Sequence, residues 1–314
     1  MEQGEIVRAC MARGLLVSGE DLKRIEAGMS IDELLASKQM QQPQQEERAG
    51  KLTYRFWKTK QKETVTPSDI LEQQKNRYET IKGLLLSKTS AISINNARDN
   101  AASVSLIGMV RQVTENGFVL EDFTDEIDVA CEGSKPAAVD EGDVISVRGP
   151  VKNGKLLCKD IIYPDVPLLR PIGRIDASLL LITKQAKPAT GSDVILSTNP
   201  IESDAKNIII NASPSHLGIY KDGRKVNVLF YRTEGEMDQQ AAINMLKKRG
   251  LKKGRGFVAD GEAYLMEPVP DILWIVGKGR DWIETYKGVS IIHTQENSEK
   301  QAFIDLRTRE AKLI

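Results

Sequence analysis

The strongest constraint on the fold is a change of residue pattern near position 104. From there to residue 163, five short runs rich in β-branched and aromatic residues alternate with turn signals. The runs span residues 104–112, 117–121, 126–131, 143–149 and 155–163. Runs of this length and composition predict strands, and their close spacing predicts that neighbours in sequence pair with one another.

Two turn dipeptides indicate how these strands connect. Asn116-Gly117 and Asn153-Gly154 tolerate positive φ angles, so each is predicted to join two antiparallel strands. Gly149 is expected to end one strand before a hairpin follows. Five strands in this order are typical of a small Greek-key barrel of the OB type, which we place at residues 101–167.

An OB barrel binds single-stranded nucleic acid when one face carries exposed aromatic residues and cations. The predicted barrel offers Phe118, Phe123 and Tyr163 among several acids, which would repel a phosphate backbone. These acids are Glu121, Asp122, Asp125, Glu126 and Asp128. We therefore favour a barrel that docks a protein or is purely structural over a barrel that reads nucleic acid.

Length and charge limit the remaining possibilities. The 314 residues are enough for two or three domains with their own cores. Forty-four Lys and Arg residues balance forty-four Asp and Glu residues, so the chain as a whole has no electrostatic drive to coat nucleic acid. Any contact with DNA is therefore expected to come from local patches or from a partner.

Cysteine usage and hydropathy predict a cytoplasmic protein. Cys10, Cys131 and Cys158 are odd in number and far apart, which disfavours both a disulfide framework and a zinc site. No stretch approaches the roughly 20 apolar residues of a membrane span. Glu2 and Glu5 stand where a signal peptide has basic residues. We expect no contact with a membrane.

The N-terminal third is predicted to be helical, with a linker. Residues 1–38 carry apolar residues at helical spacing, with Ser18 and Ser30 as N-caps, and predict three short helices that serve either in docking or as an appendage. Residues 39–65 are rich in Gln, Glu and Lys and predict a flexible linker. Within them, residues 52–57 form an aromatic island, which we interpret as a strand packed on the main body rather than a peptide ligand motif.

Residues 66–100 are predicted to form a helical connector. The run Thr66-Pro67-Ser68-Asp69 is a capping sequence for a helix that starts near Ile70. Its buried stripe is predicted to comprise Leu71, Tyr78, Ile81, Leu84 and Leu85.

A second helix is predicted at residues 237–249, and a cluster of cations follows it. This candidate contact for phosphate or a partner comprises Lys247, Lys248, Arg249, Lys252, Lys253 and Arg255. The alternative is a solvated helix end whose cations complement the helix dipole.

Several segments resemble one known family. The chain resembles the OB domain of the small subunit of archaeal family-D DNA polymerase in four segments, residues 105–111, 142–149, 154–156 and 161–167. The sequence Tyr-Pro-Asp-Val-Pro at 163–167 is the most specific part of this resemblance. The N-terminal helices and the Gln-rich linker stand where that family has a small helical domain and a variable tether.

The resemblance continues beyond the barrel and covers most of the chain. Residues 267–272 and 286–292 resemble strands of the family's calcineurin-like phosphoesterase domain. The implied fold is an α+β multidomain protein: a small N-terminal helical domain, an OB-type β-barrel and a degenerate α/β calcineurin-like phosphoesterase domain at residues 168–314.

The family's metal motifs are not intact in this chain. Its Asp-x-His, Gly-Asp, Asn-His and Gly-His-x-His motifs and a further metal-binding histidine each follow a buried strand, and the residues after the corresponding apolar runs differ. Arg232 occupies the place of that further histidine. The degenerate positions are Lys184, Ala186, Asn211, His216, Arg232, Lys278 and Arg280. Ammonium and guanidinium groups offer only hydrogen-bond donors and cannot hold a divalent cation as imidazole does.

The chain has two histidines, His216 and His293, too few to rebuild a two-metal site. We interpret His293 as a core residue on a buried strand. No metal or other cofactor is expected, and the cations are expected to attract an acidic side chain or a phosphate. About 145 residues follow Pro167. This short length predicts missing helices and an apolar sheet face that another subunit must cover.

The resemblance implies a non-catalytic accessory subunit that docks the large catalytic subunit of an archaeal family-D replicative polymerase. DNA would be bound mainly through the complex. A sliding clamp is a further candidate partner, although residues 301–306 alternate like a strand and lack the paired aromatics of a clamp-binding peptide. The alternatives are a 3′-to-5′ exonuclease, as in intact family members, and an independent single-stranded-DNA-binding OB protein.

Overall fold

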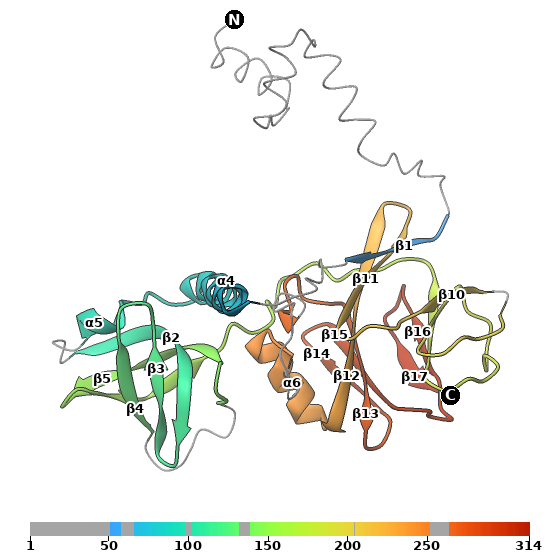
Figure 1. The fold of residues 1–314 in the computed structure, drawn as a ribbon. Helices are drawn as coiled ribbons and strands as arrows, with labels where there is room; N and C mark the ends of the chain where they lie inside the picture. The colour runs from blue at the N-terminus through green and yellow to red at the C-terminus, as the bar shows by residue number, and fades with distance from the viewer. Residues whose placement is uncertain (1–50, 58–65, 98–101, 132–138, 204, 252–263) are drawn as a thin grey trace, which may run out of the picture. The chain divides into compact units, whose positions relative to one another are not determined.

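The computed structural model describes residues 51–57, 66–97, 102–131, 139–203, 205–251 and 264–314. The chain divides into two compact units, Met1–Lys51 and Leu52–Ile314. The helices predicted within residues 1–38 and most of the linker predicted at 39–65 lie outside the described residues. The second unit contains a barrel and a two-sheet sandwich (Figure 1).

The first body is a closed five-stranded barrel. Its strands, with one additional edge strand, are β2 (Ser103–Thr114), β3 (Gly117–Glu121), β4 (Glu126–Cys131), β5 (Val144–Lys152), β6 (Lys155–Cys158) and β7 (Asp160–Ile162). The order β2-β3-β4-β6-β5 closes because β2 also pairs with β5, and β7 adds to β5. Leu106, Phe118, Ile145 and Leu156 fill the interior. An OB-like barrel is thus confirmed at the predicted place.

One of the predicted turn features is wrong. Strand β5 does not end at Gly149 but continues to Lys152, and a Cβ atom at Gly149 would collide with the carbonyl of Leu157. Glycine is needed there for close strand approach rather than for termination. The β2–β3 hairpin joins two antiparallel strands at the predicted place, with its turn at Glu115 and Asn116, although neither Asn116 nor Gly117 has a positive φ. Asn153-Gly154, with φ of 52° and 72°, forms its turn as predicted.

Two helices pack on the barrel. Helix α4 (Pro67–Leu86) starts three residues earlier than predicted, because Thr66 and Asp69 form a capping box and Pro67 occupies the first turn. Tyr78, Ile81 and Leu85 are buried, whereas Leu71 is exposed, contrary to the predicted stripe. The short helix α5 (Ile94–Ala97) adds Ile94 and Ala97 to the barrel core.

The second body is a sandwich of two sheets. The large sheet has the order β1 (Thr53–Trp57), β11 (Ser215–Lys221), β12 (Arg224–Glu236), β13 (Ile272–Lys278), β15 (Val289–Gln295) and β14 (Trp282–Tyr286). The small sheet has the order β10 (Lys206–Ile209), β9 (Val194–Ser197), β8 (Ser178–Ile182), β16 (Ala302–Asp305) and β17 (Ala311–Leu313). One apolar core, including Leu179, Leu196, Phe230 and Trp274, lies between them.

The outer faces are covered unequally. Helix α6 (Gln239–Lys248) packs Met245 and Leu246 against the large sheet, in one cluster with Leu229 and Leu273. Among the described residues of 168–314, α6 is the single α-helix. This region is therefore mostly β and not the expected α/β arrangement. On the small sheet, Leu180, Ile182 and Ile195 are buried, and Ile201 and Ala205 from the following loop pack on them. The chain's own loops thus cover a face that was expected to be bare.

The described helices include none that is long and apolar enough to cross a membrane. The aromatic island forms strand β1 at the edge of the large sheet, and residues 302–305 form strand β16, as predicted.

Candidate functional site

Six strand ends meet at one end of the sandwich. Strands β8, β9 and β10 run parallel in the small sheet, and β12, β13 and β15 run parallel in the large sheet. The carboxyl ends of parallel strands lie at a common sheet edge, where α/β folds usually bind ligands. The Thr183 hydroxyl, after β8, donates to the Gln295 carbonyl at the end of β15 at 2.8 Å. The two sheets therefore share one carboxyl edge.

The turn at residues 296–301 crosses this carboxyl edge from β15 to β16. Glu296 lies 3.3 Å from Arg232, and Glu299 forms an ion pair with Lys184. The backbone N–H of Ser298 donates to the Thr183 hydroxyl at 3.1 Å. Two of the cations predicted to enter a vacated metal site are thus neutralised by acids of a single turn.

Lys278 is the last residue of strand β13, Arg280 follows it, and both are exposed. The loop that carries them needs glycine twice: a Cβ atom at Gly277 would collide with Thr233, and Gly279 has a φ of 107°. Asp281 holds the loop in place, because its carboxylate accepts from the Gln295 backbone N–H at 2.7 Å and from the Ser298 hydroxyl at 2.6 Å. The loop is ordered by the chain itself.

His293 is a core residue, as predicted. It is fully buried on β15, stacks on Trp282 at 5.4 Å between ring centroids, and its Nδ1 lies 2.9 Å from the Arg280 carbonyl oxygen. Burial lowers the pKa of His293, against the smaller opposing effects of that carbonyl and of Asp281. Its Nε2 is buried without a hydrogen-bond partner among the described residues, which favours a neutral ring.

The remaining predicted positions do not converge on one site. Ala186 is half-buried in the loop after β8, and Asn211 is exposed after β10. His216 lies within strand β11, opposite Trp57 of β1, with a ring separation of 6.4 Å. In the described part of the chain, no group of three or more His, Cys, Asp or Glu side chains could hold a metal ion. The residues present do not fit a dinuclear metal centre.

The predicted cation cluster after α6 is engaged in internal contacts. Lys248 lies 2.6 Å from both Asp140 and Asp143, and Arg249 is buried and donates to the Met266 carbonyl at 2.9 Å. Arg249 is the helix C-cap, with a φ of 55°. Lys247 is half-buried. The other members, Lys252, Lys253 and Arg255, lie outside the described residues.

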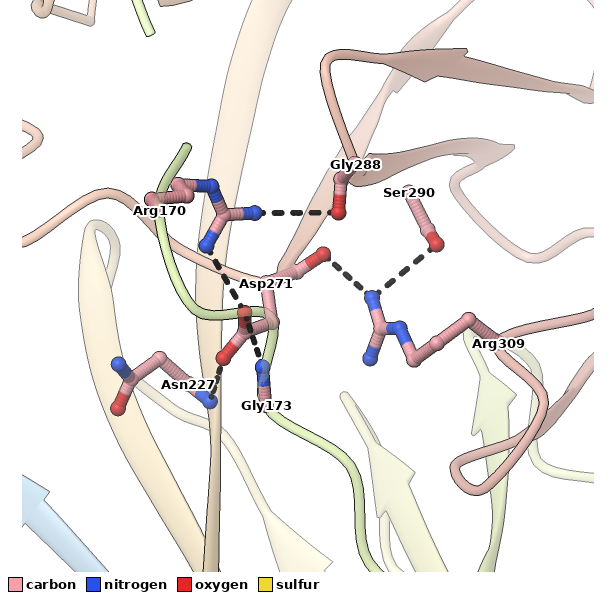
Figure 2. Close-up of polar contacts among 7 residues, drawn as sticks. All are labelled: Arg170, Gly173, Asn227, Asp271, Gly288, Ser290 and Arg309. Atoms are coloured by element: carbon pink, nitrogen blue, oxygen red, sulfur yellow. Dashed lines mark hydrogen bonds and ion pairs between the residues drawn. The ribbon is translucent and has the colours of Figure 1, made fainter. Parts of the chain in front are cut away.

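The opposite, amino-terminal end of the large sheet holds a buried carboxylate that sequence reasoning missed (Figure 2). The Asp271 side chain accepts from Arg170 at 3.0 Å and from the backbone N–H groups of Gly173 and Asn227, each at 2.9 Å. Arg309 donates to the Asp271 carbonyl, and burial lowers the pKa of Arg309 to about 10. No motif marks this cluster, because its members come from four distant segments.

The chain is similar to a known polymerase subunit over part of its length. No protein-family model matches it. A stretch of 107 residues, 32% of the chain, is 33% identical to the DNA polymerase II small subunit of Archaeoglobus fulgidus. That stretch covers 22% of the relative, so it establishes a distant relationship and not the resemblance over most of the chain that the motifs suggested.

Among solved structures, the solution NMR structure of a Thermotoga maritima protein aligns with 44% of the chain and 96% of its own length. The TM-score is 0.27 and the sequence identity 10%, values at which the match defines no fold relationship.

Proposed function

We propose that this chain is a non-catalytic accessory small subunit of an archaeal family-D replicative DNA polymerase, which docks the large catalytic subunit and supports DNA replication. The observation that carries the proposal is the 33% identity over 107 residues with the A. fulgidus polymerase small subunit. A closed barrel at the place where the resemblance puts the OB domain supports it. The proposal includes the domain boundaries stated above and contact with DNA mainly through the complex.

The chemistry of the carboxyl edge supports a subunit without hydrolytic activity. A two-metal phosphoesterase holds its ions roughly 3.5–4 Å apart within a shell of carboxylates and imidazoles. Here Lys184 and Arg232 stand at two of the corresponding positions, and Glu299 and Glu296 form ion pairs with them. Asp281 is already occupied by backbone and hydroxyl donors. This arrangement offers neither a ligand set nor a general base for an activated water.

Two adjacent leucines are candidates for the docking contact. Leu168 and Leu169 follow the barrel in residues 164–177 and are 78% and 99% exposed. A partner that covers two adjacent apolar side chains removes their surface from water, which favours association. Single exposed leucines, by contrast, are common on protein surfaces.

The test is purification of the tagged full-length chain from its native host, with identification of the attached proteins. We expect recovery of a large DNA polymerase subunit with the wild-type chain, and at least ten-fold less with Leu168→Ser/Leu169→Ser. Leu71→Ser/Leu86→Ser is the matched control, because it removes two exposed leucines from α4. Recovery of no polymerase subunit with the wild-type chain would contradict the proposed function.

A manganese-dependent nuclease assay on the purified chain with 3′-labelled DNA distinguishes the exonuclease alternative from the proposed non-catalytic function. We expect no release of nucleotides above the level of a buffer control. Release that depends on manganese and on the intact carboxyl edge would make the chain an enzyme.

A further inference from the structure

Strand β1 brings exposed aromatic and cationic side chains to the edge of the large sheet. It pairs with β11 in a register that sets Trp57 opposite His216 and Arg55 opposite Gly218. Tyr54 is 40% exposed, Arg55 is exposed, and Trp57 is half-buried. Because side chains alternate along a strand, Arg55 and Trp57 share one face of the sheet and Tyr54 lies on the other.

Two lysines from other strands lie over these rings. The ammonium of Lys225, on β12, is 3.6 Å from the centroid of Trp57 and 5.5 Å from that of Tyr220. The ammonium of Lys206, on β10, is 4.9 Å from the centroid of Tyr54. These distances fit cation–π contacts. We call Tyr54, Arg55, Trp57, Lys206, Tyr220 and Lys225 the β1 edge cluster.

A glycine makes room for the cluster. A Cβ atom at Gly218 would lie 2.8 Å from the Tyr220 ring and 2.9 Å from the Lys225 side chain. Any larger residue there would displace both groups from the sheet surface. Gly218 thus leaves space on the surface of β11 in which the Tyr220 ring and the Lys225 side chain lie side by side.

The cluster contains three cations and no acid. Among the ion pairs of the described residues, none involves Arg55, Lys206 or Lys225. Burial lowers the pKa of Lys225, Asp271 opposes this, and the nearby charge of Arg55 lowers the pKa further. The like charges of Arg55 and Lys225 favour an anionic partner, since a phosphate or carboxylate would relieve their repulsion.

We propose that the β1 edge cluster binds single-stranded nucleic acid, with bases against the aromatic rings and phosphates at the three cations. Sequence-tolerant binding of single strands combines such rings with a cationic path for the backbone. A site on the sandwich also differs from the barrel face, where acids outnumber cations: Arg111, for example, lies between Glu121 and Glu126. An acidic protein segment is the competing occupant, but it has no use for the aromatic rings that lie beside the cations.

The test is fluorescence anisotropy of a labelled oligothymidylate of about 20 nucleotides, titrated with the full chain at several salt concentrations. We expect Arg55→Gln/Lys206→Gln/Lys225→Gln to weaken binding at least ten-fold and to reduce the slope of log affinity against log salt by about 2. The matched control removes three exposed barrel lysines, Lys152→Gln/Lys155→Gln/Lys159→Gln, and should weaken binding less than two-fold. Thermal melting of both variants checks that they fold.

Tryptophan fluorescence gives an independent readout. Trp274 and Trp282 are buried, so quenching by added oligonucleotide reports on Trp57 and should disappear in Trp57→Phe. Equal losses in the two triple variants would mean only general charge attraction and would overturn the proposal. Absence of wild-type binding, or quenching that persists in Trp57→Phe, would also overturn it. Because no polymerase subunit is present in these titrations, their outcome is independent of the proposed docking function.

Discussion

Arg232, in the carboxyl-terminal half of strand β12, forms an ion pair with Glu296, with 3.3 Å between Nε and Oε1. The pair joins a strand of the large sheet to the turn that leads into the small sheet. A cation stands where the phosphoesterase resemblance requires a histidine, and the chain supplies its counter-charge. Lys184 and Glu299 repeat this relationship. Lys184 and Arg232 are therefore paired with acids of the 296–301 turn rather than left as free cations in a cleft.

Removing both acids should expose the cations. In Glu296→Gln/Glu299→Gln the free energy of unfolding should change by less than about 1 kcal/mol, because both ion pairs are largely solvent-exposed. Binding of inorganic pyrophosphate, measured by calorimetry at low salt, should strengthen. Unchanged binding would mean that Lys184 and Arg232 are inaccessible even without their acids.

Restoring imidazoles to the last motif should not restore hydrolysis. The variant Lys278→His/Arg280→His recreates a Gly-His-x-His loop, yet the facing positions still hold Lys184 and Arg232 rather than metal ligands. We expect no manganese-dependent cleavage of a 3′-labelled strand. Measurable cleavage would show that the carboxyl edge still carries metal ligands, and would contradict a lost hydrolytic site.

The buried carboxylate at the opposite end should matter for stability. Asp271→Asn removes the charge facing Arg170 and offers one acceptor atom in place of two, so we expect a loss of about 3–5 kcal/mol in chemical denaturation. The matched control is Asp176→Asn, whose side chain is 79% exposed and 3.9 Å from Lys221, and which should cost less than about 1 kcal/mol. Equal effects of the two variants would contradict a structural role for Asp271.

Stability should decline in mild acid because of His293. Its pKa is lowered in the folded protein, so between that value and the unfolded pKa of about 6.5 the unfolded chain binds more protons. The free energy of unfolding should therefore fall as pH drops below about 6.5, and this contribution should level off below the folded pKa. Urea denaturation from pH 5 to 8 should show a smaller slope in His293→Asn, whose amide can still donate to the Arg280 carbonyl. An unchanged slope would contradict the assignment.

Local signals in the sequence located the barrel strands, although the run predicted as one strand at 155–163 forms two, β6 and β7. Strands β3 and β4 have the predicted ends, because short alternating runs and turns depend on neighbouring residues. Gly149 was misread, since the close approach of Leu157 that requires glycine is a tertiary contact. Leu71 was misread because helical spacing does not reveal where the barrel beneath α4 ends.

The candidate site was only half predictable. The apolar run before Lys184 located the end of β8, whereas Arg232 lies within β12, which continues to Glu236. The acids that neutralise them could not be found, because Lys184 and Glu299 are 115 residues apart and meet only when the two sheets stack. The same holds for Asp271 and Arg170, which are 101 residues apart.

Anomalous diffraction from a crystal of this chain soaked in manganese is the most direct test of the carboxyl edge. With Lys184, Arg232, Lys278 and Arg280 in place of ligands, we expect no pair of manganese peaks between the ends of β8 and β13. Two peaks roughly 3.5–4 Å apart, coordinated by side chains of that edge, would contradict a subunit that has lost its hydrolytic centre.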